Sequence, residues 1–312
     1  MNFIKAKKWL HLPLLLTLIF SFSCHRNIPK PPTPHPVYLT SILKIPFLEV
    51  RRRLKSGLSF DNYGFETEPF YRITFLSQDS AKILNPLNGE YYDFKVYRMT
   101  DSVFSVARSF FKILQLGNDS MKFQVMSVEG DTMHILRSVV YMTFYSQHYL
   151  HDVLHKTAKE LGKPDHRDTM YIMQKSQLAN RIPDSAFAAR QPATLTSINR
   201  LAKVEQNIIN PDVMNNFDAS DGYMNPEFNI TINRAYENFS YSFWAFVDDK
   251  GKLIYDRTDE MVEPEFKEST NKTLKAIVDG YLSYYLKITP GSTLGIKHTS
   301  RILLNVVGRT GK

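Results

Sequence analysis

The fold is decided by residues 70–145, which contain four runs rich in apolar side chains: FYRITFLS (70–77), EYYDFKVYRM (90–99), SMKFQVMSV (120–128) and TMHILRSVVYMTFY (132–145). Apolar and polar residues alternate in these runs, as Tyr71, Ile73 and Phe75 do in the first of them. Turn signals such as Asn88-Gly89 separate the runs at intervals of about ten residues, which is typical of an antiparallel meander. We therefore expect a β-rich N-terminal domain over residues 41–146.

Two architectures fit this meander, a curved sheet packed on a helix and a small barrel. The pattern of hairpins over residues 70–145 resembles the lipocalin-like, or calycin-like, lipoprotein domains of Bacteroidota. The resemblance implies a barrel with a cavity for a small apolar or glycan ligand.

The spacing of apolar residues changes after Ser146. Leu150, Leu154 and Leu161 share one face of a helix that we expect over residues 148–161, with Gly162 as its stop signal. A second helix is predicted over residues 195–209. We interpret residues 147–225 as a helical connector.

The last part of the chain, residues 226–312, reads as a β-hairpin, a helix and a final strand. The stretches FWAFVDDKGKLIYDRTDE (243–260), PEFKESTNKTLKAIVDGYL (264–282) and KITPGSTLGIKHTSRILLNVVG (287–308) resemble the C-terminal domain of TonB. In that family the terminal strand pairs with a segment of an outer-membrane receptor. The resemblance implies a partner-binding strand formed by these residues: Arg301, Ile302, Leu303, Leu304, Asn305, Val306 and Val307. The alternative is an ordinary hairpin capped by a helix. With the β-rich domain, this part predicts an α+β fold class.

The N-terminus has the form of a secretory signal over residues 1–23. Three lysines precede an apolar run that is shorter than the roughly 20 residues needed to span a bilayer. Ser21-Phe22-Ser23-Cys24 resembles the lipobox of bacterial lipoproteins, in which the cysteine is acylated, with palmitate for example; the alternative is a chance cysteine beside an ordinary cleavage site. Residues 24–40 then form a Pro-rich tether of about 3 Å per residue. We expect the acylated Cys24 to bind the lipid bilayer.

The remaining charge is modest. Removal of residues 1–23 takes away three lysines and lowers the formal net charge from +8 to +5. The basic run Arg51-Arg52-Arg53 is interpreted as a solvated surface, and export argues against nucleic acid as a partner. His25 follows Cys24 without an acidic cluster, as in lipoproteins that stay on the periplasmic side of the outer membrane.

No catalytic set stands out, because the sequence contains neither GxSxG nor a phosphate-binding glycine loop. His148, His151 and His155 have a spacing that can hold zinc on a helix, but their placement away from the apolar face favours solvated side chains, and we expect no cofactor. The sequence therefore predicts a non-catalytic lipoprotein that binds an outer-membrane protein or complex. The alternative is a binding protein for a small apolar or glycan ligand.

Overall fold

The computed structural model describes residues 39–129, 134–210 and 220–311. The expected signal sequence, Cys24 and nearly all of the expected Pro-rich tether lie outside the described residues. Residues 36–312 belong to one compact unit.

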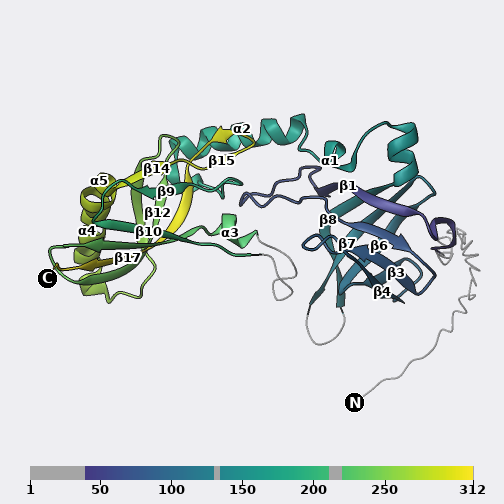
Figure 1. Ribbon diagram of the computed structural model, residues 1–312, viewed down its shortest axis with the longest axis horizontal. Coiled ribbons are helices and arrows are strands. Elements are labelled where there is room, and N and C mark those ends of the chain that lie inside the picture. Colours follow the sequence, from purple (N-terminus) through teal and green to yellow (C-terminus); the bar gives the residue numbers. More distant parts are fainter. Residues whose placement is uncertain (1–38, 130–133, 211–219, 312) are drawn as a thin grey trace, which may run out of the picture. The chain divides into compact units, whose positions relative to one another are not determined.

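The N-terminal meander is a closed antiparallel barrel of eight strands (Figure 1). Its strands are β1 (Pro46–Leu54), β2 (Arg72–Phe75), β3 (Ser80–Leu84), β4 (Tyr91–Arg98), β5 (Val103–Val106), β6 (Ser109–Leu116), β7 (Ser120–Glu129) and β8 (His134–Ser146). Neighbouring strands pair in sequence order, and β1 pairs with β8 to close the barrel. Closure removes the sheet edges that an open meander would expose. Of the two architectures expected from the sequence, the structure has the barrel.

Phenylalanine side chains fill most of the barrel interior. Phe104 lies 5.8 Å from Phe75, 5.5 Å from Phe111 and 5.3 Å from Phe123 between ring centroids, and Phe123 lies 5.4 Å from Phe144. Aromatic pairs at these separations contribute roughly 0.5–1.5 kcal/mol each beyond the area that they bury. The inward positions of the alternating runs therefore form the core.

The segment after the barrel contains the helices that were expected of a connector, together with two strands that were not expected. It contains the π-helical turn η2 (Tyr149–Val153), α1 (Ala158–Leu161), α2 (His166–Arg181), the short 3-10 helix η3 (Pro183–Ser185), β9 (Thr194–Ser197), β10 (Ala202–Asn207) and α3 (Asp221–Met224). The helix predicted over residues 148–161 is interrupted at His155, whose φ is +51°. The helix α2 was not predicted, although Asp165 and Asp168 form a capping box at its start.

The helix predicted over residues 195–209 is wrong. β9 pairs with β14 (Leu286–Thr289), and β10 pairs with β11 (Glu227–Asn233). Pairing with partners elsewhere in the chain has overridden the local apolar spacing.

The C-terminal part is a mixed sheet in the order β10-β11-β17-β12-β13, covered on one face by helix. Its further elements are β12 (Phe239–Val247), β13 (Leu253–Thr258), η4 (Pro264–Phe266), α4 (Lys267–Ile277), the π-helical turn η5 (Val278–Leu282), α5 (Ser283–Tyr285), β15 (Ser292–Thr293), β16 (Ile296–Lys297) and β17 (Ser300–Arg309). Leu274 and Ile277 of α4 pack in one core with Phe243 and Leu304 of the sheet. The predicted hairpin, helix and final strand are present, and the α+β fold class is confirmed.

The loop between β1 and β2 packs on α2. Phe60 of the loop shares a small core with Ile172 and Ala179 of α2. The Ser59 amide donates to Asp168, whose carboxylate is fully buried and lies 3.4 Å from the Arg53 guanidinium. This packing fixes the loop that carries the charged residues described next.

Candidate functional site

The two ends of the barrel differ. At one end the 3-10 helix η1 (Leu39–Ile42) is packed into the barrel, with Ile42 fully buried and the Leu39 amide donating to Gln78 at 3.1 Å. The space left there is about 30 Å³, which suffices for roughly one water molecule. The chain itself closes this end.

The other end contains a cavity of about 520 Å³, here called the mouth cavity. Its floor is apolar and is lined by Phe111 and Met142 of the barrel core. Arg52 in the second half of β1 lines the cavity, whereas Pro46 at the start of β1 follows η1, so the cavity lies at the end opposite to η1. Its lining residues are Arg52, Phe65, Glu66, Thr67, Glu68, Phe70, Tyr71, Ser109, Phe111, Val125, Val140, Met142, Arg190, Ser220 and Tyr223.

One wall of the mouth cavity is an internally neutral ion pair. Arg52 donates from Nε to Glu49 Oε1 at 2.7 Å and from Nη2 to Glu49 Oε2 at 2.6 Å. Glu49 Oε2 also accepts the backbone amides of Phe70 and Tyr71, both at 3.0 Å. The guanidinium carbon lies 4.4 Å from the Phe70 ring centroid. Such bidentate, charge-assisted bonds fix the orientation of the arginine plane.

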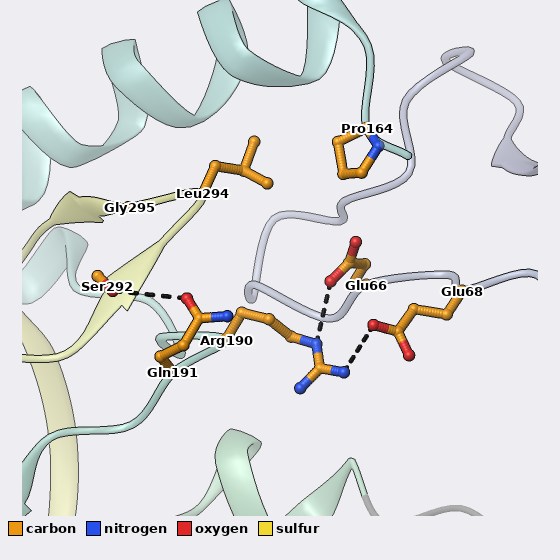
Figure 2. Close-up of a pocket in the computed structure, with 8 residues that line it drawn as sticks. All are labelled: Glu66, Glu68, Pro164, Arg190, Gln191, Ser292, Leu294 and Gly295. Carbon is orange, nitrogen blue, oxygen red and sulfur yellow. Dashed lines mark hydrogen bonds and ion pairs between the residues drawn. The ribbon is translucent and has the colours of Figure 1, made fainter. Parts of the chain in front are cut away.

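A second charged group, here called the Glu-Arg-Glu triad, consists of Glu66, Arg190 and Glu68. Arg190 donates from Nε to Glu66 Oε2 at 3.0 Å and from Nη2 to Glu68 Oε1 at 2.6 Å (Figure 2). Its guanidinium carbon lies 4.6 Å from the centroid of the Tyr223 ring, and the Tyr223 hydroxyl accepts the Glu66 amide at 3.0 Å. One arginine is thus shared by two carboxylates.

The electrostatic environment of the triad raises the pKa of Glu66. Burial of this carboxyl is the main cause, and the neighbouring Glu68 charge adds to it, while Arg190 acts in the opposite direction. Burial also raises the pKa of Tyr223, which therefore keeps its proton. The triad thus has two carboxyl groups for one guanidinium, and burial favours the protonated form of Glu66.

Backbone contacts hold Arg190 in place. Its amide donates to the Thr293 hydroxyl at 3.1 Å, and the next residue, Gln191, exchanges two amide bonds of 2.9 Å with Ser292. Gly64 adopts a φ of +96°, and a Cβ atom at this position would lie only 2.3 Å from the Ala188 carbonyl oxygen. Glycine is therefore required where the loop meets the segment that carries Arg190.

A second hollow, of about 490 Å³, adjoins the triad (Figure 2). Its lining residues are Glu66, Glu68, Pro164, Arg190, Gln191, Ser292, Leu294 and Gly295. Few of these side chains are apolar, so this hollow offers less to a ligand than the mouth cavity does. The triad lines both.

Near the triad, a buried histidine has a structural environment. His298 is fully buried, stacks on Phe187 with a centroid separation of 3.8 Å, and contacts Thr293 through Nε2 at 3.0 Å and the Thr299 carbonyl through Nδ1 at 3.1 Å. Burial lowers its pKa to about 4. The imidazole is therefore neutral at physiological pH.

The three histidines that were considered for zinc lie on the surface. His148 Nδ1 and His151 Nδ1 contact the two oxygens of Asp152 at 2.5 and 2.6 Å, and His155 Nδ1 lies 3.0 Å from the His151 carbonyl oxygen. The bonds from His151 and His148 lower the pKa of Asp152. Within residues 39–129, 134–210 and 220–311, no group of three or more His, Cys, Asp or Glu side chains has an arrangement that could hold a metal ion.

The strand considered for partner binding is not at an edge. β17 lies between β11, which is parallel to it, and β12, which is antiparallel to it, so both of its hydrogen-bonding edges are occupied. The expectation that a partner strand adds to this segment is therefore wrong for the residues paired on both sides, Leu303, Leu304, Asn305, Val306 and Val307, while Arg301 and Ile302 pair with β12. The edges of this sheet are β10 and β13.

The basic run near residue 51 is also not the solvated surface that was expected. The Arg52 side chain is 15% exposed and the Arg53 side chain 9%, and both face buried carboxylates. Only Arg51 is exposed. Sequence reasoning missed the triad because Glu66 and Arg190 are 124 residues apart. The pair Glu66-x-Glu68 carries no motif that would have indicated it.

No protein-family model matches the chain, and none of the curated proteins matches it. None of the helices in the described ranges has the length and apolarity needed to cross a membrane.

Proposed function

We propose that this protein is a cell-envelope lipoprotein, tethered to the outer membrane through acylated Cys24 and facing the periplasm, that binds a small ligand with an apolar body. The observation that carries the proposal is the mouth cavity: about 520 Å³ of space at one end of a barrel whose remaining interior is filled by side chains. Small-molecule sites are typically cavities of roughly 300–1,000 Å³ with apolar walls and a few polar groups.

The walls of the mouth cavity supply both kinds of contact. The apolar surface comes from Phe111, Val125, Val140 and Met142. The charged residues that line the same cavity are Arg52, Glu66, Glu68 and Arg190. Each methylene of a ligand buried against such a surface contributes roughly 0.8 kcal/mol before the costs of association. A ligand chain of about eight carbons is therefore sufficient for micromolar to millimolar affinity.

The tether supports this proposal through the connectivity of the chain. The described chain begins at Leu39, in the helix that closes the barrel end opposite to the cavity. The first described residues thus belong to the barrel end away from the mouth cavity.

The experiment uses two adjacent valines of β8 on opposite faces of the barrel wall. Val140 lines the mouth cavity, whereas Val139 is 52% exposed. Val140→Phe should reduce the space and abolish binding of N-phenyl-1-naphthylamine, a neutral dye whose fluorescence increases in apolar sites. Val139→Phe adds the same ring outside and should leave the dye affinity unchanged.

Two results would contradict the proposal. One is that the wild-type protein does not bind the dye. The other is that Val140→Phe and Val139→Phe proteins, each with an unaltered circular dichroism spectrum, bind it equally well.

A further inference from the structure

Aromatic rings form the largest group of side chains around the mouth cavity. They belong to Phe65, Phe70, Tyr71, Phe111 and Tyr223. Aromatic side chains have few rotatable bonds, so they present flat faces whose shape changes little when a ligand binds. A cavity with such walls favours a flat, rigid ligand over a flexible chain.

Three of these rings form a row that leads from an exposed position to the floor of the cavity. Phe70 is 48% exposed, and its ring centroid lies 5.0 Å from that of Tyr71. The Tyr71 ring lies 6.2 Å from the Phe111 ring, and the two planes are nearly perpendicular at 81°. Phe111 itself is buried in the barrel core. The row therefore continues the aromatic core of the barrel outward, and at Phe70 it has apolar surface that the fold does not cover.

The two arginines that line the cavity are stacked on rings in the same way. The guanidinium carbon of Arg52 lies 4.4 Å from the Phe70 centroid and 5.6 Å from the Tyr71 centroid. That of Arg190 lies 4.6 Å from the Tyr223 centroid. Hydrogen bonds to glutamates run in the plane of each guanidinium, so the carboxylates occupy its edges, and its flat faces are the part that contacts aromatic surface.

We infer that the ligand of the mouth cavity is a planar aromatic compound that stacks on the row of Phe70, Tyr71 and Phe111. The inference rests on the proposed function, since it names the class of ligand for the same cavity. A cavity of about 520 Å³ is large enough for fused rings. Contact between a ligand ring and one ring of the row strengthens binding by about two- to twelvefold beyond the effect of the buried area.

The test compares 2-naphthalenemethanol with its saturated counterpart, decahydro-2-naphthalenemethanol, which has the same carbon skeleton and the same hydroxyl group. Each competes with N-phenyl-1-naphthylamine for the full mature chain. Burial of apolar surface alone does not favour the aromatic compound, because the saturated rings carry more hydrogen atoms and at least as much apolar surface. The aromatic compound should displace the dye at about one fifth of the concentration that the saturated compound needs.

Variants assign this preference to the row of rings, and the measured quantity is the ratio of the two displacing concentrations. Phe70→Leu removes an exposed ring and keeps an apolar side chain, so the ratio should fall below about twofold. Tyr71→Leu removes the middle ring of the row and should lower the ratio as well. Phe266→Leu is the matched control, because Phe266 is 57% exposed and does not line the cavity, and it should keep the wild-type ratio.

The outcomes separate the two proposals. If the saturated compound displaces the dye at the same or a lower concentration than the aromatic one, the aromatic inference is overturned and the binding function stands. The same holds if folded Phe70→Leu and Tyr71→Leu proteins both keep the wild-type ratio. If the wild-type protein does not bind the dye, the binding function fails, and the inference fails with it.

Discussion

Replacing Glu49 by glutamine should destabilise the barrel by several kcal/mol. Glu49 is buried, and its carboxylate compensates the charge of Arg52, whose side chain is 15% exposed. Glutamine has nearly the same shape, so the substitution removes charge and leaves the packing largely unchanged. The variant therefore isolates the electrostatic role of this wall of the mouth cavity.

The magnitude follows from the contacts. Glu49 Oε2 accepts from Arg52 Nη2 and from the amides of Phe70 and Tyr71, and the amide oxygen of glutamine can continue to accept these bonds. The bond from Arg52 Nε to Oε1 is lost, because a glutamine NH2 group at that position is itself a donor. Removing one partner of a buried ion pair costs about 3–5 kcal/mol, and the retained bonds place Glu49→Gln near 3 kcal/mol.

The assay is urea unfolding of the mature chain followed by circular dichroism. The double variant Glu49→Gln/Arg52→Met removes the uncompensated charge and should recover most of the stability, to within about 1 kcal/mol of the wild type. Glu90→Gln, with an exposed side chain, should stay within about 0.5 kcal/mol. A cost below about 1 kcal/mol for Glu49→Gln, or a double variant as unstable as the single one, would refute the reasoning.

Three further predictions concern other parts of the chain. The pKa of His298 is about 4 in the folded chain and 6.5 in the unfolded chain. The neutral imidazole should therefore contribute about 3 kcal/mol to the free energy of unfolding above pH 6.5, and this contribution should be lost as the pH falls from 6.5 to 4. If the stability of His298→Gln depends on pH in this window as that of the wild type does, the prediction is contradicted. Gly64→Ala should lower the free energy of unfolding in urea by more than about 3 kcal/mol, because Gly64 has a φ of +96° and the new Cβ would clash with the Ala188 carbonyl. Gly89 has a φ of +73° and no atom near the new Cβ, so Gly89→Ala should cost only about 1 kcal/mol. Equal costs for the two variants would argue against the clash. Cys24→Ser should abolish incorporation of a labelled fatty acid into the full-length chain expressed in bacteria, and a labelled serine variant would exclude acylation at this residue.

Much of the strand content could be predicted because its signals are local. Alternation in FYRITFLS (70–77) and the turn residues Asn88-Gly89 depend on neighbours in sequence, and the corresponding elements are present. The same holds for the hairpin and helix after residue 226. Helix spacing over residues 195–209 was misleading, because strand partners from distant parts of the chain decided the conformation there.

The candidate site was not predictable in the same way. Arg190 is one arginine in a segment without a motif, and its role depends on contacts with Glu66 and Glu68, more than 120 residues earlier. The histidine cluster that did attract attention in the sequence lies exposed on the surface. Charge balance around a cavity is a property of distances in space, which residue spacing along the chain does not give.

The sequence by itself determined the α+β class, the alternating strands of the meander and the order of hairpin, helix and strand at the C-terminus. These features depend on side-chain periodicity and turn chemistry within about ten residues. Only the tertiary structure decided that β1 pairs with β8 to close a barrel, that β17 lies inside its sheet, and that a mouth cavity remains beside the Glu-Arg-Glu triad. Each of these outcomes depends on backbone pairing or ion pairing between residues far apart in sequence, whose free energy is set by the folded geometry.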